Sequence, residues 1–138
     1  MPANTTPIFV KQGNFTPARI AAANSDNSGA SGALVDVVTA TTDGTRVDSI
    51  RFINSGTALV ASAATRINIF HTVGATIRNV GQVLMPAATR SATALGATAI
   101  YTFDQAFILK SGEKISVTST NWAAAADNID ACAFAGDF

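Results

Sequence analysis

Few residues in this chain of 138 could do acid–base, nucleophilic or metal chemistry. His71, Cys132 and Glu113 are each the only residue of their type, and 13% of all residues are charged. An enzyme site is normally a cluster of titratable groups that shift one another's pKa values. The composition therefore predicts a non-enzymatic protein with no catalytic residues, no metal and no cofactor.

Each chemically capable side chain has a structural interpretation. No metal-ligand or serine-triad motif surrounds His71, so we expect a histidine at a strand end beside the Val73-Gly74 turn. Cys132 has no CxxC neighbour and lies in an alternating segment, which predicts a buried thiol. The segment Asp127-Asn128-Ile129-Asp130 offers calcium ligands without the glycine-interrupted spacing of a calcium loop, so we interpret it as a turn.

The charge balance bears on partners. Nine basic and nine acidic residues give a net charge of +0, which argues against electrostatic binding of nucleic acid. It also leaves little repulsion between copies, which favours a subunit of an assembly over a bland monomer. No apolar run approaches the roughly 20 residues of a membrane span. Residues 1–6 lack the basic and apolar regions of a signal peptide, so we expect neither a membrane partner nor secretion.

Alternation of apolar and polar residues predicts short β-strands throughout the chain. Glu113–Ser119 is the clearest, since Ile115 and Val117 face one way and the polar residues between them face the other. The remaining predicted strands are Ala18–Ala23, Leu34–Thr41, Arg46–Asn54, Thr65–His71, Thr76–Pro86, Thr98–Phe103, Ala106–Lys110 and a last strand over Ile129–Phe134.

Glycine-containing turns separate these strands. Asp43-Gly44 predicts a hairpin between the strands on either side of it, and residues 24–32 form a long, polar and flexible loop. Eight or nine short strands at this spacing predict one all-β domain over residues 1–138, a β-sandwich or jelly roll of antiparallel strands.

Five residues are candidates for contacts with other subunits. Residues 1–14 could form an extended arm that docks on a neighbour through Ile8, Phe9 and Val10, or a disordered terminus with one edge strand. Trp122, in a small-residue loop, could anchor a protein contact or cap the core of its own domain. Phe138, the last residue, is the fifth candidate.

Three segments together resemble a known class of protein. They are the strand–turn–strand Leu34–Ile50 around Asp43-Gly44-Thr45-Arg46, the strand–turn–strand from Arg66 to Arg78, and the ending Ala133-Phe134-Ala135-Gly136-Asp137-Phe138. In this order they resemble small virion structural proteins of tailed bacteriophages, over about three-quarters of the chain from Leu34 onward.

The resemblance implies a subunit of a phage particle, assembled in the host cytoplasm. A capsid decoration (cement) protein on the major capsid protein lattice, forming a homo-oligomer with a trimer favoured, is the first expectation. A tail, neck or fibre-base component is the second. From the fold class alone, a carbohydrate- or receptor-binding jelly roll is a further alternative, but Trp122 and Tyr101 are the only Trp and Tyr, and sugar sites need aromatic platforms.

Overall fold

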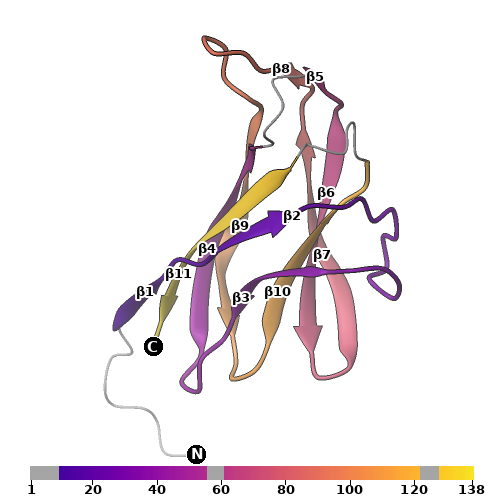
Figure 1. Ribbon diagram of the computed structural model, residues 1–138. Helices are drawn as coiled ribbons and strands as arrows, with labels where there is room; N and C mark the ends of the chain where they lie inside the picture. Colours follow the sequence, from indigo (N-terminus) through magenta and orange to yellow (C-terminus); the bar gives the residue numbers. More distant parts are fainter. Residues whose placement is uncertain (1–9, 56–60, 122–127) are drawn as a thin grey trace, which may run out of the picture.

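The described part of the chain consists of β-strands and the connections between them (Figure 1). The structure is a computed structural model, and it describes residues 10–55, 61–121 and 128–138. These ranges hold eleven strands and no helix. The strands are β1 (Gln12–Asn14), β2 (Pro17–Ile20), β3 (Val35–Thr39), β4 (Thr45–Asn54), β5 (Ala61–Ser62), β6 (Thr65–Val73), β7 (Thr76–Met85), β8 (Ala88–Thr89), β9 (Thr98–Leu109), β10 (Lys114–Ser119) and β11 (Ile129–Asp137).

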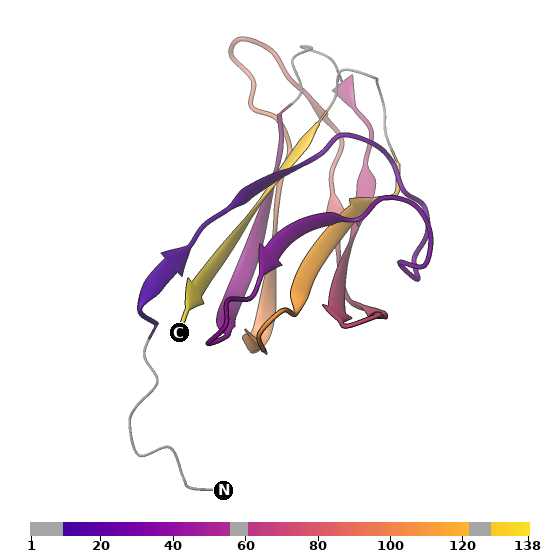
Figure 2. The ribbon, with the colours of Figure 1, turned by 60° about the horizontal axis from the view of Figure 1, so that its bottom comes forward.

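Two antiparallel sheets pack face to face, which confirms the predicted all-β sandwich (Figure 2). Sheet I has the order β1-β11-β4-β9, with β2 following β1 along the same edge of β11. Sheet II has the order β3-β10-β6-β7, and β5 and β8 form a small separate pair. From β2 onward, the strands of the two main sheets pair inward from both ends of the chain: β2 with β11, β3 with β10, β4 with β9, and β6 with β7.

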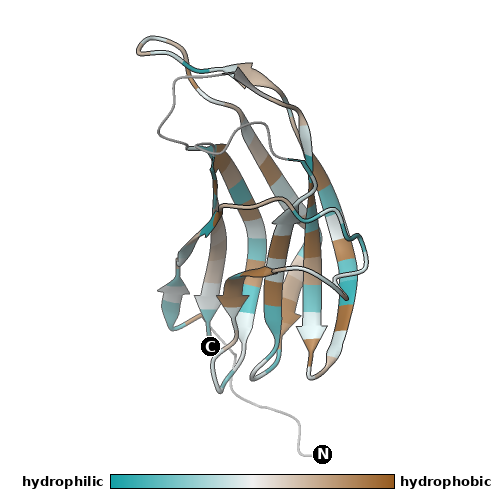
Figure 3. Cartoon of the chain, turned by 45° about the vertical axis from the view of Figure 1, so that its right-hand side comes forward, coloured by the Kyte–Doolittle hydropathy of each residue, from teal (hydrophilic) through white to brown (hydrophobic). Residues whose placement is uncertain are grey.

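The core lies between the two sheets and is built by the alternation that the sequence shows (Figure 3). Within sheet I, large side chains of β4 lie beside small ones of the neighbouring strand β11. Phe52 pairs in register with Ala131, and Ile50 with Ala133, and all four are fully buried. Burying an Ile or Phe side chain stabilises the fold by about 1.5–3 kcal/mol. Small residues beside large ones on the inner side of sheet I leave room for side chains of sheet II, so the two sheets can pack closely.

The nine predicted strands correspond to eight of those found, and the short strands β1, β5 and β8 were not predicted as separate strands. The two strands predicted over 98–103 and 106–110 are the halves of one strand, β9. Pairing with β4 moves from Thr102 opposite Ser49 to Phe107 opposite Val47, so residues 103–106 face the single residue Asp48. This bulge interrupts the alternation, which is why the pattern predicts two strands.

The hairpin predicted at Asp43-Gly44 is wrong. A tight turn is present, with Gly44 at φ 98° and its N–H bonded to Thr41 O at 3.1 Å. The strands on either side, however, belong to different sheets, β3 to sheet II and β4 to sheet I. Turn chemistry determines where the chain reverses, but side-chain burial determines which strand each arm pairs with. Here the turn closes one end of the sandwich.

Candidate interaction surface

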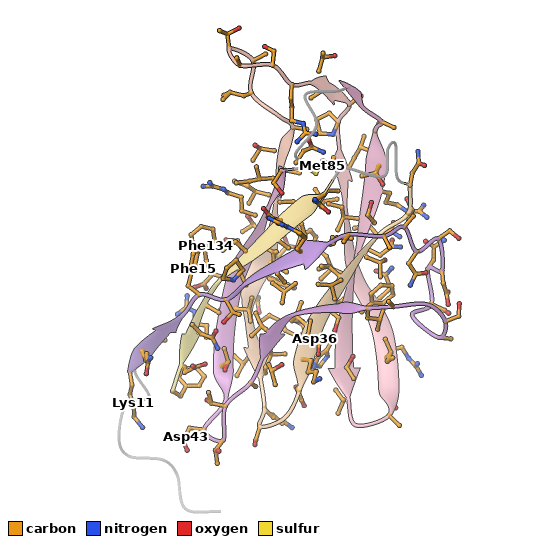
Figure 4. The ribbon with its side chains drawn as sticks, viewed as in Figure 1. Lys11, Phe15, Asp36, Asp43, Met85 and Phe134 are labelled. Atoms are coloured by element: carbon orange, nitrogen blue, oxygen red, sulfur yellow. The ribbon has the colours of Figure 1, made fainter. Side chains whose placement is uncertain are left out.

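Two phenylalanines lie against each other on the outer side of sheet I (Figure 4). Phe134 points outward from β11 because its neighbour Ala133 points into the core. Phe15 lies in the break between β1 and β2, both of which pair with β11. The ring centroids are 5.7 Å apart and the rings tilted by 59°, a favourable aromatic geometry. Phe15 is 61% and Phe134 43% exposed, so this contact lies at the surface.

Further apolar side chains extend this surface across the sheet. On the far strand β9, Ile100 is 57% and Ile108 55% exposed, because Leu109 and Tyr101 beside them point inward. We call the whole surface the Phe134 face; its apolar members are Phe15, Pro17, Ile53, Ile100, Ile108, Cys132 and Phe134. One face of an antiparallel sheet is commonly polar and in contact with water. Exposed apolar side chains gathered on such a face are typical of a binding site for another protein.

The Phe134 face carries two shallow, open hollows. One hollow of about 370 Å³ contains Arg51 among apolar side chains; its lining is Phe15, Pro17, Arg51, Ile53, Asp130, Cys132 and Phe134. A second, of about 470 Å³, lies on the other side of the phenylalanine pair, next to Val10 and Gly136. Aromatic residues and arginine are among the side chains most enriched in protein interfaces.

Some charged side chains on this face form ion pairs within the chain, and two others form none among the described residues. Arg19 pairs with Asp130 at 2.7 Å, and Arg46 with Asp48 at 2.8 Å. The hydrogen bond from Arg19 holds the pKa of Asp130 below its usual value, against the opposing effect of burial.

Arg51 on β4 and Asp104 on the β9 bulge are exposed. Within the described ranges, neither side chain has a hydrogen-bond or ion-pair partner. Both groups are therefore available to a partner.

Part of the outer side of sheet II is covered by the chain itself. The loop of residues 24–32 crosses it, with Gly29 over the buried ring of Phe70. Asn27 fastens the loop by accepting hydrogen bonds from Arg66 (2.6 Å) and Asn68 (3.0 Å) on β6. Phe70 thus has an intramolecular cover, whereas Leu84 on β7 stays exposed.

Asp26 holds the shape of this loop. Its carboxylate accepts four hydrogen bonds of 2.7 Å, from the backbone N–H and the hydroxyl of both Ser28 and Ser31. These bonds, with the Ser28 hydroxyl first, hold the pKa of Asp26 far below its usual value. The loop predicted from composition is therefore strongly hydrogen-bonded internally.

His71 and Glu113 form a hydrogen-bonded pair at one end of the sandwich. The His71 Nε2 donates to the Glu113 carboxylate at 2.9 Å, and the imidazole lies edge-on to Phe107 with centroids 5.0 Å apart. Glu113 also accepts a hydrogen bond from the backbone N–H of Lys110 at 3.2 Å. Burial raises the pKa of Glu113, but the bonds from Lys110 and His71 outweigh it, so its pKa lies below its usual value. The pair ties β6 to the turn between β9 and β10.

The other candidate residues are distributed as follows. Cys132 lies half-buried on the Phe134 face, where burial raises the pKa of its thiol. Among residues 10–55, 61–121 and 128–138, no three His, Cys, Asp or Glu side chains gather as metal ligands. Asp130, a candidate calcium ligand, pairs with Arg19 instead, and Asp127 lies outside the described residues.

Two of the five predicted contact residues can be placed. Val10 is 44% exposed and rests on Gly136, and Phe138 is half-buried against Gly44. Ile8, Phe9 and Trp122 lie outside the described residues. Only part of the predicted arm can be placed: Gln12–Asn14 form β1, which pairs with β11 of the same chain, and residues 1–9 lie outside the described residues. The sequence reasoning did not select Phe15, Phe134, Ile100 or Arg51; only the outward phase of Phe134 in its strand pointed to this surface.

Comparisons with known proteins do not identify a family. No protein-family model matches the chain, and no curated protein sequence matches it. Among the described residues, no helix is long and apolar enough to cross a membrane.

Proposed function

We propose that the chain is a non-enzymatic structural subunit of a tailed-phage particle. In this proposal it is a capsid decoration (cement) protein that binds the outer surface of the major capsid protein lattice. It works as a homo-oligomer, with a trimer as the form that the sequence resemblance favours. The observation that carries the proposal is the Phe134 face, an apolar and hollowed surface that the described chain does not cover. Such a surface is stable in water when a neighbouring protein covers it.

The connectivity supports the same role. We infer a jelly roll from the nested pairing of β2 with β11, β3 with β10, β4 with β9 and β6 with β7. Jelly rolls are frequent in virus capsids and in lectins. The His71–Glu113 pair also fits a structural subunit, because its hydrogen bonds join two strand ends within the fold rather than facing a hollow.

Imaging of purified particles tests the proposal. In phage particles that carry this sequence, we expect mass spectrometry to detect the chain in many copies and electron cryo-microscopy to place it on the capsid surface. A position at the tail, neck or fibre base would replace the cement assignment with the second expectation. Absence from the particle, together with binding on a glycan array, would favour the carbohydrate-binding alternative.

A variant of the Phe134 face tests the observation itself. We expect Phe15→Ser with Phe134→Ser to lower the copy number on particles, since it removes the exposed ring pair without changing a core residue. Leu84→Ser is the matched control, because Leu84 is equally exposed but lies on β7 of sheet II. Equal copy numbers for both variants would contradict the role of the Phe134 face.

A further inference from the structure

We infer that the Phe134 face binds a second copy of this chain, face to face and with twofold symmetry, so that Arg51 of each copy pairs with Asp104 of the other. The inference rests on the assembly role proposed above, but it assigns the Phe134 face to a second copy instead of the capsid lattice, and a dimer instead of a trimer as the form in solution. It therefore holds or fails in solution, independently of any phage particle.

Charge complementarity on a single face identifies the occupant. The other two charged pairs of the face, Arg19–Asp130 and Arg46–Asp48, are satisfied within the chain. Arg51 and Asp104 remain, one cation and one anion without partners in the described chain. A twofold contact brings the same patch of both copies together, so residue i meets residue j and j meets i. With one unpaired Arg and one unpaired Asp on the face, a twofold contact forms two Arg–Asp pairs between the copies.

The positions of the two charges fit such a contact. Arg51 pairs in register with Ile100 on β9, and Asp104 belongs to the bulge a few residues further along the same strand. Between them lies the register pair Ser49 and Thr102, whose side chains are small. Packed sheets lie about 10 Å apart, which small central side chains permit. A twofold axis in the plane of the interface, crossing between the two charges, would place each Arg51 over the other copy's Asp104.

The apolar side chains give the contact its driving force. Phe15, Phe134, Ile100 and Ile108 surround the two charges and are each about half exposed. Burying apolar area drives association, and charged pairs then select the partner and the register. Sheet II competes less as a docking surface, because the loop over Phe70 covers part of it and its large exposed apolar side chains are Val73 and Leu84.

Single charge reversals test the pairing. Sedimentation of the wild-type chain should show a dimer that dissociates on dilution. Arg51→Asp and Asp104→Arg should each raise the dissociation constant by about tenfold or more. Each reversal turns both Arg–Asp contacts of the dimer into contacts between like charges. Arg78→Asp on β7 is the matched control and should leave the constant unchanged. A wild-type monomer at roughly 100 µM, or reversals that behave like the control, would overturn the inference.

Mixing the two reversed variants tests the symmetry. An equimolar mixture of Arg51→Asp and Asp104→Arg should form a heterodimer of wild-type strength, because both pairs are then Asp with Arg. The double variant, with both charges exchanged in one chain, should dimerise alone. In a trimeric ring the mixture would leave at least one like-charged contact in every ring. A trimer that the mixture does not restore would overturn the twofold arrangement, while the cement role could still stand on particle imaging.

Discussion

The last three residues show how side chains without chemistry can still be specific. Gly136 leaves room for Val10, because a Cβ there would come within 2.3 Å of the Val10 side chain. The Asp137 carboxylate accepts hydrogen bonds from Asn14 of β1 (3.1 Å) and from the fully buried Thr45 of β4 (2.5 Å). Phe138 lies over the Gly44 turn. The Gly-Asp-aromatic ending, which supports the phage resemblance, therefore fastens two strands and the Asp43-Gly44 turn to the end of β11.

Removing the Asp137 carboxylate tests this. We expect Asp137→Ala to lower the free energy of unfolding by about 1–3 kcal/mol, because the buried Thr45 hydroxyl and the Asn14 amide both lose their acceptor. Urea denaturation measures the change. Asp43→Ala is the control: Asp43 is an exposed carboxylate with only a 3.7 Å pair to Lys11, and its loss should cost less than about 1 kcal/mol. Equal effects in the two variants would contradict the fastening role.

Glu113 predicts how stability depends on pH. Its pKa in the folded chain lies below the value of 4.5 expected when unfolded, so the carboxylate stabilises the fold above pH 4.5. This contribution should disappear as pH falls from 4.5 through the folded pKa. We therefore expect the melting temperature of the wild type to exceed that of Glu113→Gln at pH 7, and the difference to shrink towards pH 3. A difference that stays constant with pH would show that Glu113 acts only through packing.

At the scale of elements, the strands were predictable and their partners were not. Periodicity two placed Ile115 and Val117 inward and located β4, β6, β7 and β10 within a few residues. It could not show that β1 and β2 pair with β11, because residues 12–20 and 129–137 are related by the fold and not by a local pattern. The Phe15–Phe134 contact depends on that pairing, so the centre of the candidate site stayed hidden in the sequence.

An aromatic clasp joins the neighbouring edges of the two sheets. Tyr101 of β9 lies over Gly81 of β7 and donates a hydrogen bond to Val80 O at 3.3 Å. Its ring meets Phe103 edge-on, and Phe103 contacts Phe107. Strand edges are otherwise open to pairing with other chains, so this cluster helps to close one side of the sandwich.

A methyl group at Gly81 should open the clasp. Its Cβ would lie 2.4 Å from the Tyr101 ring, so we expect Gly81→Ala to destabilise the fold by about 1–3 kcal/mol. In Tyr101→Ala the ring is absent, and adding Gly81→Ala to it should cost less than in the wild type. Thermal unfolding of the four chains measures this coupling. Additive effects would mean that the strain at Gly81 comes from elsewhere.

The amino-terminal edge strand limits what a truncation can test. Removing residues 1–14 deletes β1 and its bonds to β11, including Lys11 N–H to Asp137 O at 2.8 Å. We expect this truncation to lower stability by about 1–3 kcal/mol. Removing residues 1–9 keeps β1 and should leave stability within about 0.5 kcal/mol. Only the removal of residues 1–9 can therefore report on docking by an arm. If it lowered stability as much as the removal of residues 1–14, residues 1–9 would be shown to support the fold.

At the scale of the whole molecule, the two outer faces are finished differently. On sheet II the loop of residues 24–32 covers Phe70 and satisfies polar groups of β6. On sheet I the Phe134 face stays open over Phe15, Ile100 and Ile108. The scarcity of charge in the sequence predicted a surface made to be covered, but composition does not show on which face of the molecule that surface lies. Only the course of the loop shows that the chain covers Phe70 on sheet II and leaves Phe15, Ile100 and Ile108 exposed on sheet I.

Loosening the loop should make the second face open as well. Asp26→Ala removes the acceptor of four hydrogen bonds that shape the loop. We expect amide exchange along β6 and β10 near Phe70 to accelerate by about tenfold or more, because local opening uncovers these strands. Exchange in β11 and β4 should not change, and Asp48→Ala on sheet I serves as the control. The uncovered Phe70 would add a second apolar surface, so this variant should also form larger species than the twofold dimer at high concentration. Unchanged exchange near Phe70 would mean that Asn27, through its bonds to Arg66 and Asn68, holds the cover in place without Asp26.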